Sequence, residues 1–356
     1  MNIGLFYGSE AFPPSTGSTV HRYHLSKGLT ERGHKLSCWY FGNGLDPNCK
    51  LFRGRQLFDF LAQIDLIYLR VDWNSRSRYL TWLRYLSRRR PPVIWELNGL
   101  PSEILFQGQS SAQLSKLERS LHSCAQSVAA GIGVTPAIRD FLQHDLKVPR
   151  SFDVPNGSDP ELFQPREKTR DRSRPLQVVW MGTTSSKWHD LERVMSAAAV
   201  LESESRAVQF RIYGDERHLP NNLPSNVRPC GTADYLKLSE FIGDADVGLV
   251  LWKPAARSNL DGSPLKMFDY MACGLATITE EERFRGKVVR ERNCGRTTDG
   301  SVDDLVKLLL ELESDRDRCY ELGRNGRIAV EDYYNWGRVA DQTNAILTSV
   351  RGEFRP

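Results

Sequence analysis

The sequence lacks a long apolar run. Nowhere in its 356 residues does an apolar stretch approach the roughly 18 residues that a membrane-spanning helix requires. The amino-terminal segment MNIGLFYGSEAFPP has no basic region and no small-residue cleavage site. This segment predicts a buried first strand rather than a signal peptide, and we expect a cytoplasmic protein.

Paired cysteines are also absent. Seven cysteines are scattered along the chain, and no two of them form a C-x-x-C motif. Zinc ligands and disulfide frameworks normally come at closer and more regular spacings. The odd number of cysteines is typical of a reducing compartment, and we expect no metal site.

The charge balance is close to neutral, with a formal net charge of +4. This excess is too small to indicate nucleic-acid binding, and we expect no nucleic-acid partner. Apolar residues make up 40% of the chain and charged residues 26%, as in an ordinary globular protein.

Positive charge is concentrated between residues 51 and 90. This stretch has nine arginines against three aspartates, ends in Arg88-Arg89-Arg90, and also contains Trp73 and Trp82. One interpretation is a solvated helix face. The other is a surface for an anionic membrane lipid or a phosphorylated acceptor, which would make the protein peripheral to the membrane.

The length predicts two domains, because single hydrophobic cores rarely grow past roughly 250–300 residues. In the first half, short apolar runs alternate with amphipathic windows, which predicts the α/β class and a parallel sheet covered on both faces. The expected strands are 2–7, 35–41, 65–70, 92–97 and 129–134, and the expected helices are 19–32, 75–88, 112–123 and 136–144.

The same alternation resumes after a break. Residues 167–175 are charged, poor in apolar residues and end in proline, as in a linker, so we divide the chain near residues 160–175. Two or three helices are expected after residue 301. Before them, the expected strands are 176–181, 208–213, 246–251 and 276–279, and the expected helices are 191–202, 235–242 and 264–273.

Small residues follow the first strand of each predicted domain. Residues 13–19 (PPSTGST) open a helix, and free backbone N–H groups at such a helix N-terminus favour an anion such as phosphate. In residues 181–187 (MGTTSSK), Gly182 allows a ligand to approach the backbone, and Lys187 places a compact positive charge nearby. The spacing is not that of a P-loop, and either segment could be a simple connecting turn.

The segment VPNGSDPELF at 154–163 contains the strong turn signal Asn-Gly. Ser158 or Asp159 is expected to cap a short helix that follows. A turn at a domain junction is the alternative, and it is compatible with a functional role.

The most specific pattern is DGSPLKMFDYMACG at 261–274. Ser263 is the expected N-cap of a helix with Pro264 at its first position, and Gly274 is the expected residue just past its end. Phe268 and Met271 supply the core-facing side of this helix, so its acidic residues are not needed for folding.

The start of this predicted helix has groups suited to a nucleotide. The N–H of Leu265 and the side chain of Lys266 would meet a diphosphate, and Asp269 would accept hydrogen bonds from a ribose diol. Asp261 precedes the helix. The alternative is an ordinary capped helix with solvated acids.

Four segments, in this order, resemble the glycosyltransferase family 4 group. They are PPSTGSTVHRYHLSKGLTERGHKL, VPNGSDPELFQP, VVWMGTTSSKWHDL and DGSPLKMFDYMACGLATI, and residues 210–216 and 226–251 are also similar to the family's second domain. Residues 332–336 resemble the segment where the family's last helix returns to the first domain. The resemblance therefore covers nearly the whole chain.

The resemblance implies the GT-B fold, with two Rossmann-like domains, mostly parallel sheets and the donor in an interdomain cleft. The first domain would comprise residues 1–160 plus 336–356, and the second residues 161–335. The implied reaction is a retaining, metal-independent transfer from a nucleoside-diphosphate sugar, such as a UDP- or GDP-sugar, with no cofactor. Polysaccharide or glycoconjugate synthesis in the cell envelope is the implied setting.

The resemblance also implies roles for single residues. The family has two acidic residues eight positions apart, usually both glutamates, and Asp261 and Asp269 have this spacing. The implied catalytic residues are Asp261, at the donor sugar's hydroxyls, Lys187, at the diphosphate, and Asn98, where the family often has a histidine. The implied donor-binding set is Gly17, Ser18, Gly182, Thr183, Lys187, Ser263, Pro264, Leu265, Lys266 and Asp269.

Besides Asp261 and Asn98, the chain departs from the family at two further positions. Thr183 stands where an arginine is usual, and Ser18 replaces the second glycine of a pair that begins with Gly17. The first domain is implied to bind a sugar or lipid-linked acceptor, with His21, Arg70 and Glu103 as its contacts. Two other functions stay open: a catalytically degenerate nucleotide-sugar-binding protein, and another enzyme of the same fold, such as an epimerase or phosphorylase.

Overall fold

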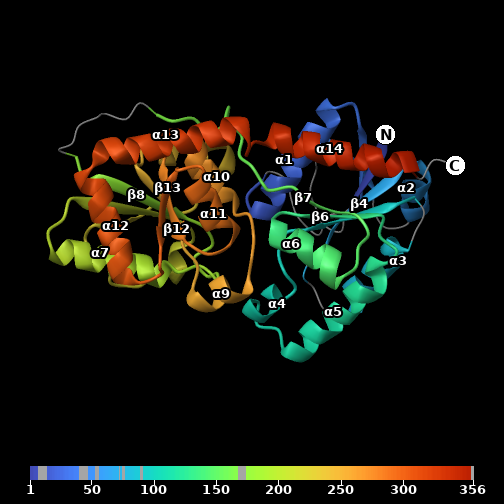
Figure 1. Ribbon diagram of the computed structural model, residues 1–356, viewed down its shortest axis with the longest axis horizontal. Coiled ribbons are helices and arrows are strands. Elements are labelled where there is room, and N and C mark those ends of the chain that lie inside the picture. Colours follow the sequence, from blue (N-terminus) through green and yellow to red (C-terminus); the bar gives the residue numbers. More distant parts are fainter. Residues whose placement is uncertain are drawn as a thin grey trace. The chain divides into compact units, whose positions relative to one another are not determined.

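The computed structural model describes residues 1–6, 14–39, 47–52, 56–71, 73, 77–88, 91–166 and 174–353. The chain divides into two compact units (Figure 1). Unit 1 comprises residues 1–156, 260–263 and 336–356, and unit 2 comprises residues 157–259 and 264–335. Most of the predicted linker, residues 167–173, lies outside the described residues.

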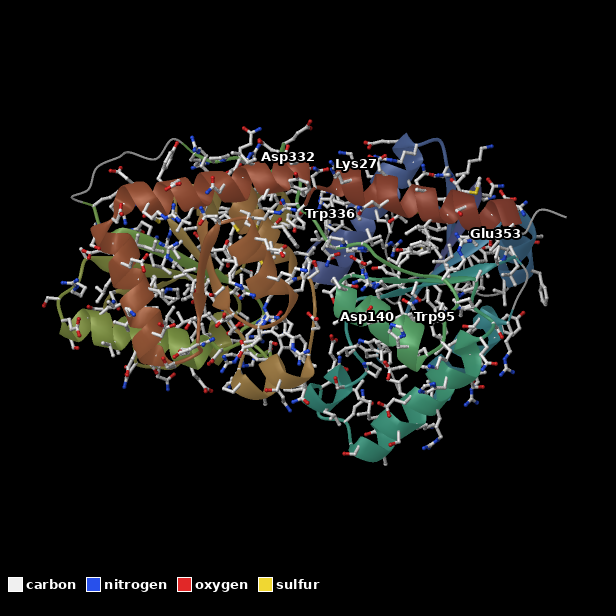
Figure 2. All side chains as sticks on the ribbon, in the orientation of Figure 1. Lys27, Trp95, Asp140, Asp332, Trp336 and Glu353 are labelled. Atoms are coloured by element: carbon white, nitrogen blue, oxygen red, sulfur yellow. The ribbon has the colours of Figure 1, made fainter. Side chains whose placement is uncertain are left out.

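Unit 1 is built on a parallel sheet whose strand order is β3-β2-β1-β4-β5-β6-β7. Its central strands are buried on both faces, and Trp95 lies fully in the core (Figure 2). Helices on both faces explain why these strands are almost continuously apolar. The strands are β1 (Asn2–Phe6), β2 (Lys35–Trp39), β3 (Lys50–Phe52), β4 (Leu66–Val71), β5 (Val93–Leu97), β6 (Ala130–Gly133) and β7 (Ser151–Asp153).

The two 15-residue helices of unit 1, α1 (Gly17–Glu31) and α5 (Ser111–Ala125), begin at clear capping signals. Thr16 caps the first helix and Ser110 the fifth, each in a reciprocal pair of side-chain to backbone hydrogen bonds. The helices are α1 (Gly17–Glu31), α2 (Leu57–Gln63), α3 (Ser77–Ser87), α4 (Glu103–Phe106), α5 (Ser111–Ala125), α6 (Pro136–Asp140), the π-helical turn η2 (Phe141–Asp145) and α14 (Trp336–Glu353).

Helix α14 belongs to unit 1 although it follows all of unit 2 in the sequence (Figure 2). It packs against α1, where Arg32 donates to Asp341 at 2.8 Å and to the carbonyl of Gly337 at 2.8 Å. Near its other end, Arg150 donates to Glu353 at 2.7 Å. Among the described residues, no helix has the length and apolar character needed to cross a membrane.

Unit 2 has a second parallel sheet, with the strand order β10-β9-β8-β11-β12-β13. Trp180 lies in its core with no exposed surface. The strands are β8 (Leu176–Met181), β9 (Val208–Tyr213), β10 (Val227–Pro229), β11 (Val247–Val250), β12 (Ala276–Glu280) and β13 (Gly295–Thr298).

The helices of unit 2 cover this sheet, and α10 and α13 pack against each other. They are α7 (Leu191–Ser203), the 3₁₀ turns η3 (Glu216–His218) and η4 (Tyr235–Lys237), α8 (Leu238–Ile242), α9 (Pro254–Asn259), α10 (Leu265–Ala272), α11 (Arg283–Glu291), α12 (Val302–Ser314) and α13 (Arg316–Asp332).

Both sheets reverse their strand order at one point. In unit 1 the reversal lies between β1 and β4, and in unit 2 between β8 and β11. In such doubly wound folds, ligands bind beyond the carboxyl ends of the strands at the reversal. The prediction of an α/β fold with two Rossmann-like, parallel-sheet halves is confirmed.

Candidate functional site

Helix α10 starts one residue later than predicted. Its N-cap is Pro264, with no side-chain cap, and its first residue is Leu265. The prediction that Ser263 caps this helix is wrong, because the Ser263 hydroxyl accepts the N–H of Asn156 at 3.0 Å. Gly274 has φ +68° just past the helix end, as predicted for that position.

Asp269 is buried in the middle of α10. The hydroxyl of Ser158 donates to its Oδ1 at 2.6 Å. Burial raises the pKa of Asp269 to about 8, and Asp159 adds to this rise, while the Ser158 hydrogen bond opposes it. Near neutral pH this carboxyl is therefore largely protonated in the ligand-free protein.

The segment around Ser158 differs from its prediction. Residues 160–162 form a turn rather than a helix, and Asp159 stabilises it by accepting the N–H groups of Glu161 and Leu162. Ser158 is occupied by Asp269 and caps no helix.

Lys266 reaches from α10 toward the end of β8. Its Nζ lies 3.2 Å from Nε2 of His189 and 4.9 Å from the centre of the Trp180 ring. Gly182, with φ +154°, follows β8, and a Cβ there would lie 2.7 Å from the same Nζ. The missing side chain of Gly182 therefore makes room for the ammonium group.

The surroundings of this pair disfavour positive charge. Burial and the nearby Arg285 lower the pKa of Lys266 to about 7, while Glu280 opposes the shift. Burial, Lys266 and Arg285 lower the pKa of His189 to about 3. Both side chains keep some exposure to solvent, but enough protein surrounds them to weaken their hydration.

The loop between β8 and α7 carries the other predicted diphosphate contacts. Thr183 and Lys187 are exposed in this loop. The hydroxyl of Thr184 donates to the carbonyl of Asp215 at 2.6 Å, which ties the loop to the residues that follow β9. Thr183 and Lys187 are therefore accessible to a ligand.

The remaining predicted donor-site residues lie in three places: at the start of α1, in the segment 260–263, which belongs to unit 1, and at Pro264, which belongs to unit 2. Asp261 is buried, and its Oδ1 accepts the N–H of Gly262 at 2.7 Å. Pro264 is partly exposed in unit 2. Gly17 and Ser18 are the first two residues of α1, which starts two residues before its predicted position.

A buried polar cluster lies at the carboxyl edge of the unit 1 sheet. His21 on α1 has its Nε2 at 3.1 Å from Oε1 of Glu96 on β5. Tyr68 donates to Oε2 of Glu96 at 2.8 Å, and Arg70 pairs in register with Glu96 across the sheet. Burial and Arg70 hold the pKa of His21 well below its ordinary value. Burial raises the pKa of Glu96, while Arg70 and the Tyr68 hydrogen bond oppose this rise.

The other predicted residues of unit 1 follow β5. Asn98 is exposed directly after that strand. Glu103, the first residue of α4, folds back over Gly99, where an added Cβ would lie 1.6 Å from its Oε1. Asn98 is accessible to a ligand, and Gly99 is needed for the position of Glu103.

The structure thus brings Gly182, Lys266 and Asp269 to one region of unit 2, and His21 and Arg70 to one region of unit 1. Their roles toward a ligand stay predictions. The sequence pattern missed His189, Glu96 and Tyr68. Tyr68 and Glu96 lie within the predicted strands 65–70 and 92–97, and His189 lies two residues before the predicted helix 191–202. Within the described ranges, no three His, Cys, Asp or Glu side chains gather to hold a metal ion.

The two sheets and the residues at their edges define a protein of the GT-B fold, the two-unit Rossmann-like architecture of many glycosyltransferases. A family model described as glycosyl transferase-like matches residues 193–345, most of unit 2. The MMP α-(1→4)-mannosyltransferase of Mycolicibacterium hassiacum is 27% identical over 200 residues, which are 54% of this chain and 47% of that protein. The chain therefore spans about half the length of this curated relative.

Solved structures resemble the whole chain. Sucrose-phosphate synthase from Thermosynechococcus elongatus has a TM-score of 0.75 and 16% identity, covering 99% of both chains. Anabaena HepE, solved with UDP and glucose, has a TM-score of 0.68 and 15% identity, covering 98% of this chain and 100% of that one. WaaG, a glycosyltransferase involved in lipopolysaccharide biosynthesis, has a TM-score of 0.68 and 14% identity with the same coverage. At these identities the likeness establishes the fold.

Proposed function

We propose that the chain is a retaining glycosyltransferase that moves a sugar from a nucleoside-diphosphate sugar to a hydroxyl acceptor. The observation that carries this proposal is on α10. Lys266 and the buried Asp269 lie one helical turn apart, beside the reversal point of the unit 2 sheet. A cation for a diphosphate and a carboxyl group for a ribose diol at this edge suit a nucleotide. The mannosyltransferase relative and the UDP complex of HepE support the same chemistry.

The reaction breaks the bond between the sugar's C1 and the diphosphate oxygen and forms a bond from C1 to the acceptor oxygen. Lys187, Lys266 and the backbone N–H groups that follow β8 would stabilise the charge that develops on the leaving diphosphate. The acceptor's proton passes to the departing phosphate oxygen, so the route needs no protein nucleophile and no metal. Asp261 and Asn98 would contact the donor sugar.

The acceptor would bind to unit 1, at His21, Arg70 and Glu103. Helices α3 and α5 of this unit expose Arg84, Lys116 and Arg119, and Arg88 is exposed just after α3. Such a face suits an anionic, lipid-linked acceptor at the cytoplasmic membrane surface, as in cell-envelope glycoconjugate synthesis. Five arginines of the basic stretch (53, 55, 76, 89 and 90) lie outside the described residues.

Three experiments test these proposals. The purified protein is incubated with UDP-, GDP- and ADP-sugars, and released nucleoside diphosphate is measured; release from none of them, with or without hydroxyl acceptors, overturns the activity. Lys187→Ala is expected to remove most turnover while the protein stays folded.

Flotation with vesicles tests the basic surface of unit 1. Equal binding to zwitterionic and anionic vesicles would overturn the proposal that this surface binds an anionic membrane.

A further inference from the structure

We propose that His189 is a positioning residue for the donor's diphosphate, because its neutral imidazole accepts a hydrogen bond from Lys266 and holds that ammonium group beyond the end of β8. This inference rests on the proposed function and deepens it. It adds a residue that no sequence pattern singled out, and it gives Lys266 a fixed location rather than a flexible reach.

The two ring nitrogens of His189 have different partners. Nδ1 lies 3.1 Å from the carbonyl oxygen of Thr183, and Nε2 lies 3.2 Å from Nζ of Lys266. A carbonyl oxygen can only accept, so Nδ1 carries the proton and Nε2 presents its lone pair. Nε2 has no proton and can only accept, so Lys266 must donate to it. The two contacts select one tautomer and one direction for each hydrogen bond.

The frame around the pair is rigid. His189 forms a β-bridge with Trp252, which follows β11, so its backbone is tied to the strand across the reversal point. Tyr270, one turn after Lys266 on α10, accepts the N–H of Met181 at 2.8 Å. The helix that carries Lys266 is thus fixed to the end of β8.

The groups packed around Lys266 and His189 restrict the position of the Lys266 ammonium group. The Trp180 ring lies 4.9 Å from Nζ, and the same ring meets the His189 ring edge-on at 5.6 Å. A Cβ at Gly182 would lie 2.7 Å from Nζ and 3.0 Å from Cε1 of His189. His189, Trp180 and the bare backbone of Gly182 therefore set the place of the charge.

The charges facing the pair decide its protonation. Arg285 repels both groups, and Glu280, which attracts Lys266, is engaged by Arg193 and Arg285. With its pKa lowered to about 3, His189 stays neutral above pH 5 and remains an acceptor. The pKa of Lys266 is about 7, so a bound diphosphate would draw a proton onto this amine. His189 would thus hold the amine of Lys266 beside the bound diphosphate, where the amine takes up a proton and becomes positively charged.

Two substitutions of His189 distinguish the positioning of Lys266 from a purely structural contact with Thr183 in the loop after β8. The amide of glutamine lies near the place of Nε2, so His189→Gln keeps an acceptor for Lys266 and loses the contact with Thr183. The amide of asparagine lies near the place of Nδ1, so His189→Asn keeps the donor to Thr183 and loses the contact with Lys266. The two variants are matched controls for each other.

The measurement is the affinity for UDP, GDP and inorganic pyrophosphate by calorimetry at pH 7. His189→Asn is expected to weaken nucleotide and pyrophosphate binding roughly tenfold, as for the loss of one hydrogen bond to a charged group, while His189→Gln stays within about twofold of wild type. Ring ¹⁵N resonances of His189 should report a proton on Nδ1 and no titration between pH 5 and 9.

The outcomes are distinct. If the wild type binds neither nucleotide nor pyrophosphate, the proposed function fails and the inference fails with it. If the wild type binds and both variants bind equally well, or Asn binds better than Gln, the positioning role alone is overturned. A titrating His189 would also overturn it.

Discussion

The two units place polar groups at equivalent edges of their sheets, but they treat these groups differently. In unit 1, His21 and Glu96 are 3% and 1% exposed and lie against each other. In unit 2, Lys266 and His189 keep some exposure, and Gly182 makes room beside them. One cluster is enclosed by the protein, whereas the other keeps a lysine that remains partly exposed to a ligand. The same topology can thus support a sealed network or a binding surface.

The largest expected effect comes from filling the space beside Lys266. Gly182→Ala would put a methyl group 2.7 Å from Nζ, at a backbone φ of +154° that side chains rarely adopt. Because the ammonium lies at the end of a flexible chain, it should move away, and we expect nucleoside diphosphate affinity to fall about 100-fold, or about 2.7 kcal/mol. Calorimetry measures this.

Gly33→Ala is the control for Gly182→Ala. Gly33 has φ +78°, but nothing lies within 4 Å of an added Cβ. It should therefore cost about 1 kcal/mol of backbone strain without changing nucleotide affinity. Equal affinities for wild type and Gly182→Ala would mean that the space beside Lys266 is not part of the site.

The next effect concerns the sealed cluster. Glu96→Ala leaves His21 and Tyr68 without their buried partner, and we expect the free energy of unfolding to fall by about 2–3 kcal/mol. Because the pKa of Glu96 is raised, the neutral amide of Glu96→Gln should cost less, about 1 kcal/mol. Urea denaturation compares the two. If the Glu96→Ala variant were as stable as Glu96→Gln, hydrogen bonds to Glu96 would not stabilise the buried cluster of His21, Tyr68 and Glu96.

A smaller effect is expected at Asp269. Its raised pKa, about 8, means that the folded protein carries a neutral carboxyl at pH 7, so Asp269→Asn should unfold at nearly the same urea concentration as wild type. An amide offers a ribose diol one oxygen where the carboxyl group offers two, and we expect nucleotide affinity to fall about tenfold.

The 2′-deoxynucleotide sharpens this test of Asp269. Wild type should bind UDP better than 2′-deoxy-UDP, and the preference should shrink in Asp269→Asn. An unchanged preference would argue that Asp269 does not meet the ribose.

The smallest expected effect is a pH dependence. The ammonium form of Lys266 is fully present below its pKa of about 7 and is lost as the pH rises through it, so nucleotide affinity should fall several-fold between pH 6.5 and 8.5. Arginine does not titrate in this range, so Lys266→Arg should remove that fall even if it binds more weakly. A decline that persists in Lys266→Arg would assign the titration to another group.

Much of the fold could be predicted from the sequence, because parallel strands that are buried on both faces consist almost entirely of apolar residues. The predicted strands 176–181 and 208–213 coincide with β8 and β9. Short edge strands were missed: β3, β7 and β10 have three residues each and mix polar with apolar positions. A three-residue strand owes its pairing to its neighbour in the sheet, which no local pattern reveals.

The candidate site was predicted less completely than the fold. Lys266 and Asp269 were found because they share one helix, and helical spacing is visible in the sequence. His189 was missed because its partners, Thr183 and Lys266, come from a turn and from a helix 77 residues away. Ser263 was assigned the wrong partner because the N–H that it binds belongs to Asn156, 107 residues earlier. Long-range contacts of this kind depend on the packing of the finished unit.

The return of α14 to unit 1 has a consequence for how the chain is made. Arg32 finds its partner Asp341 309 residues later, so a ribosome must translate all of unit 2 before the partner of α1 exists. A nascent unit 1 would expose the face of α1 that Trp336 and Ala340 later cover, where His24 stacks on the Trp336 ring with centroids 5.0 Å apart. The second unit can thus fold during synthesis, whereas the first is completed only when α14 leaves the ribosome.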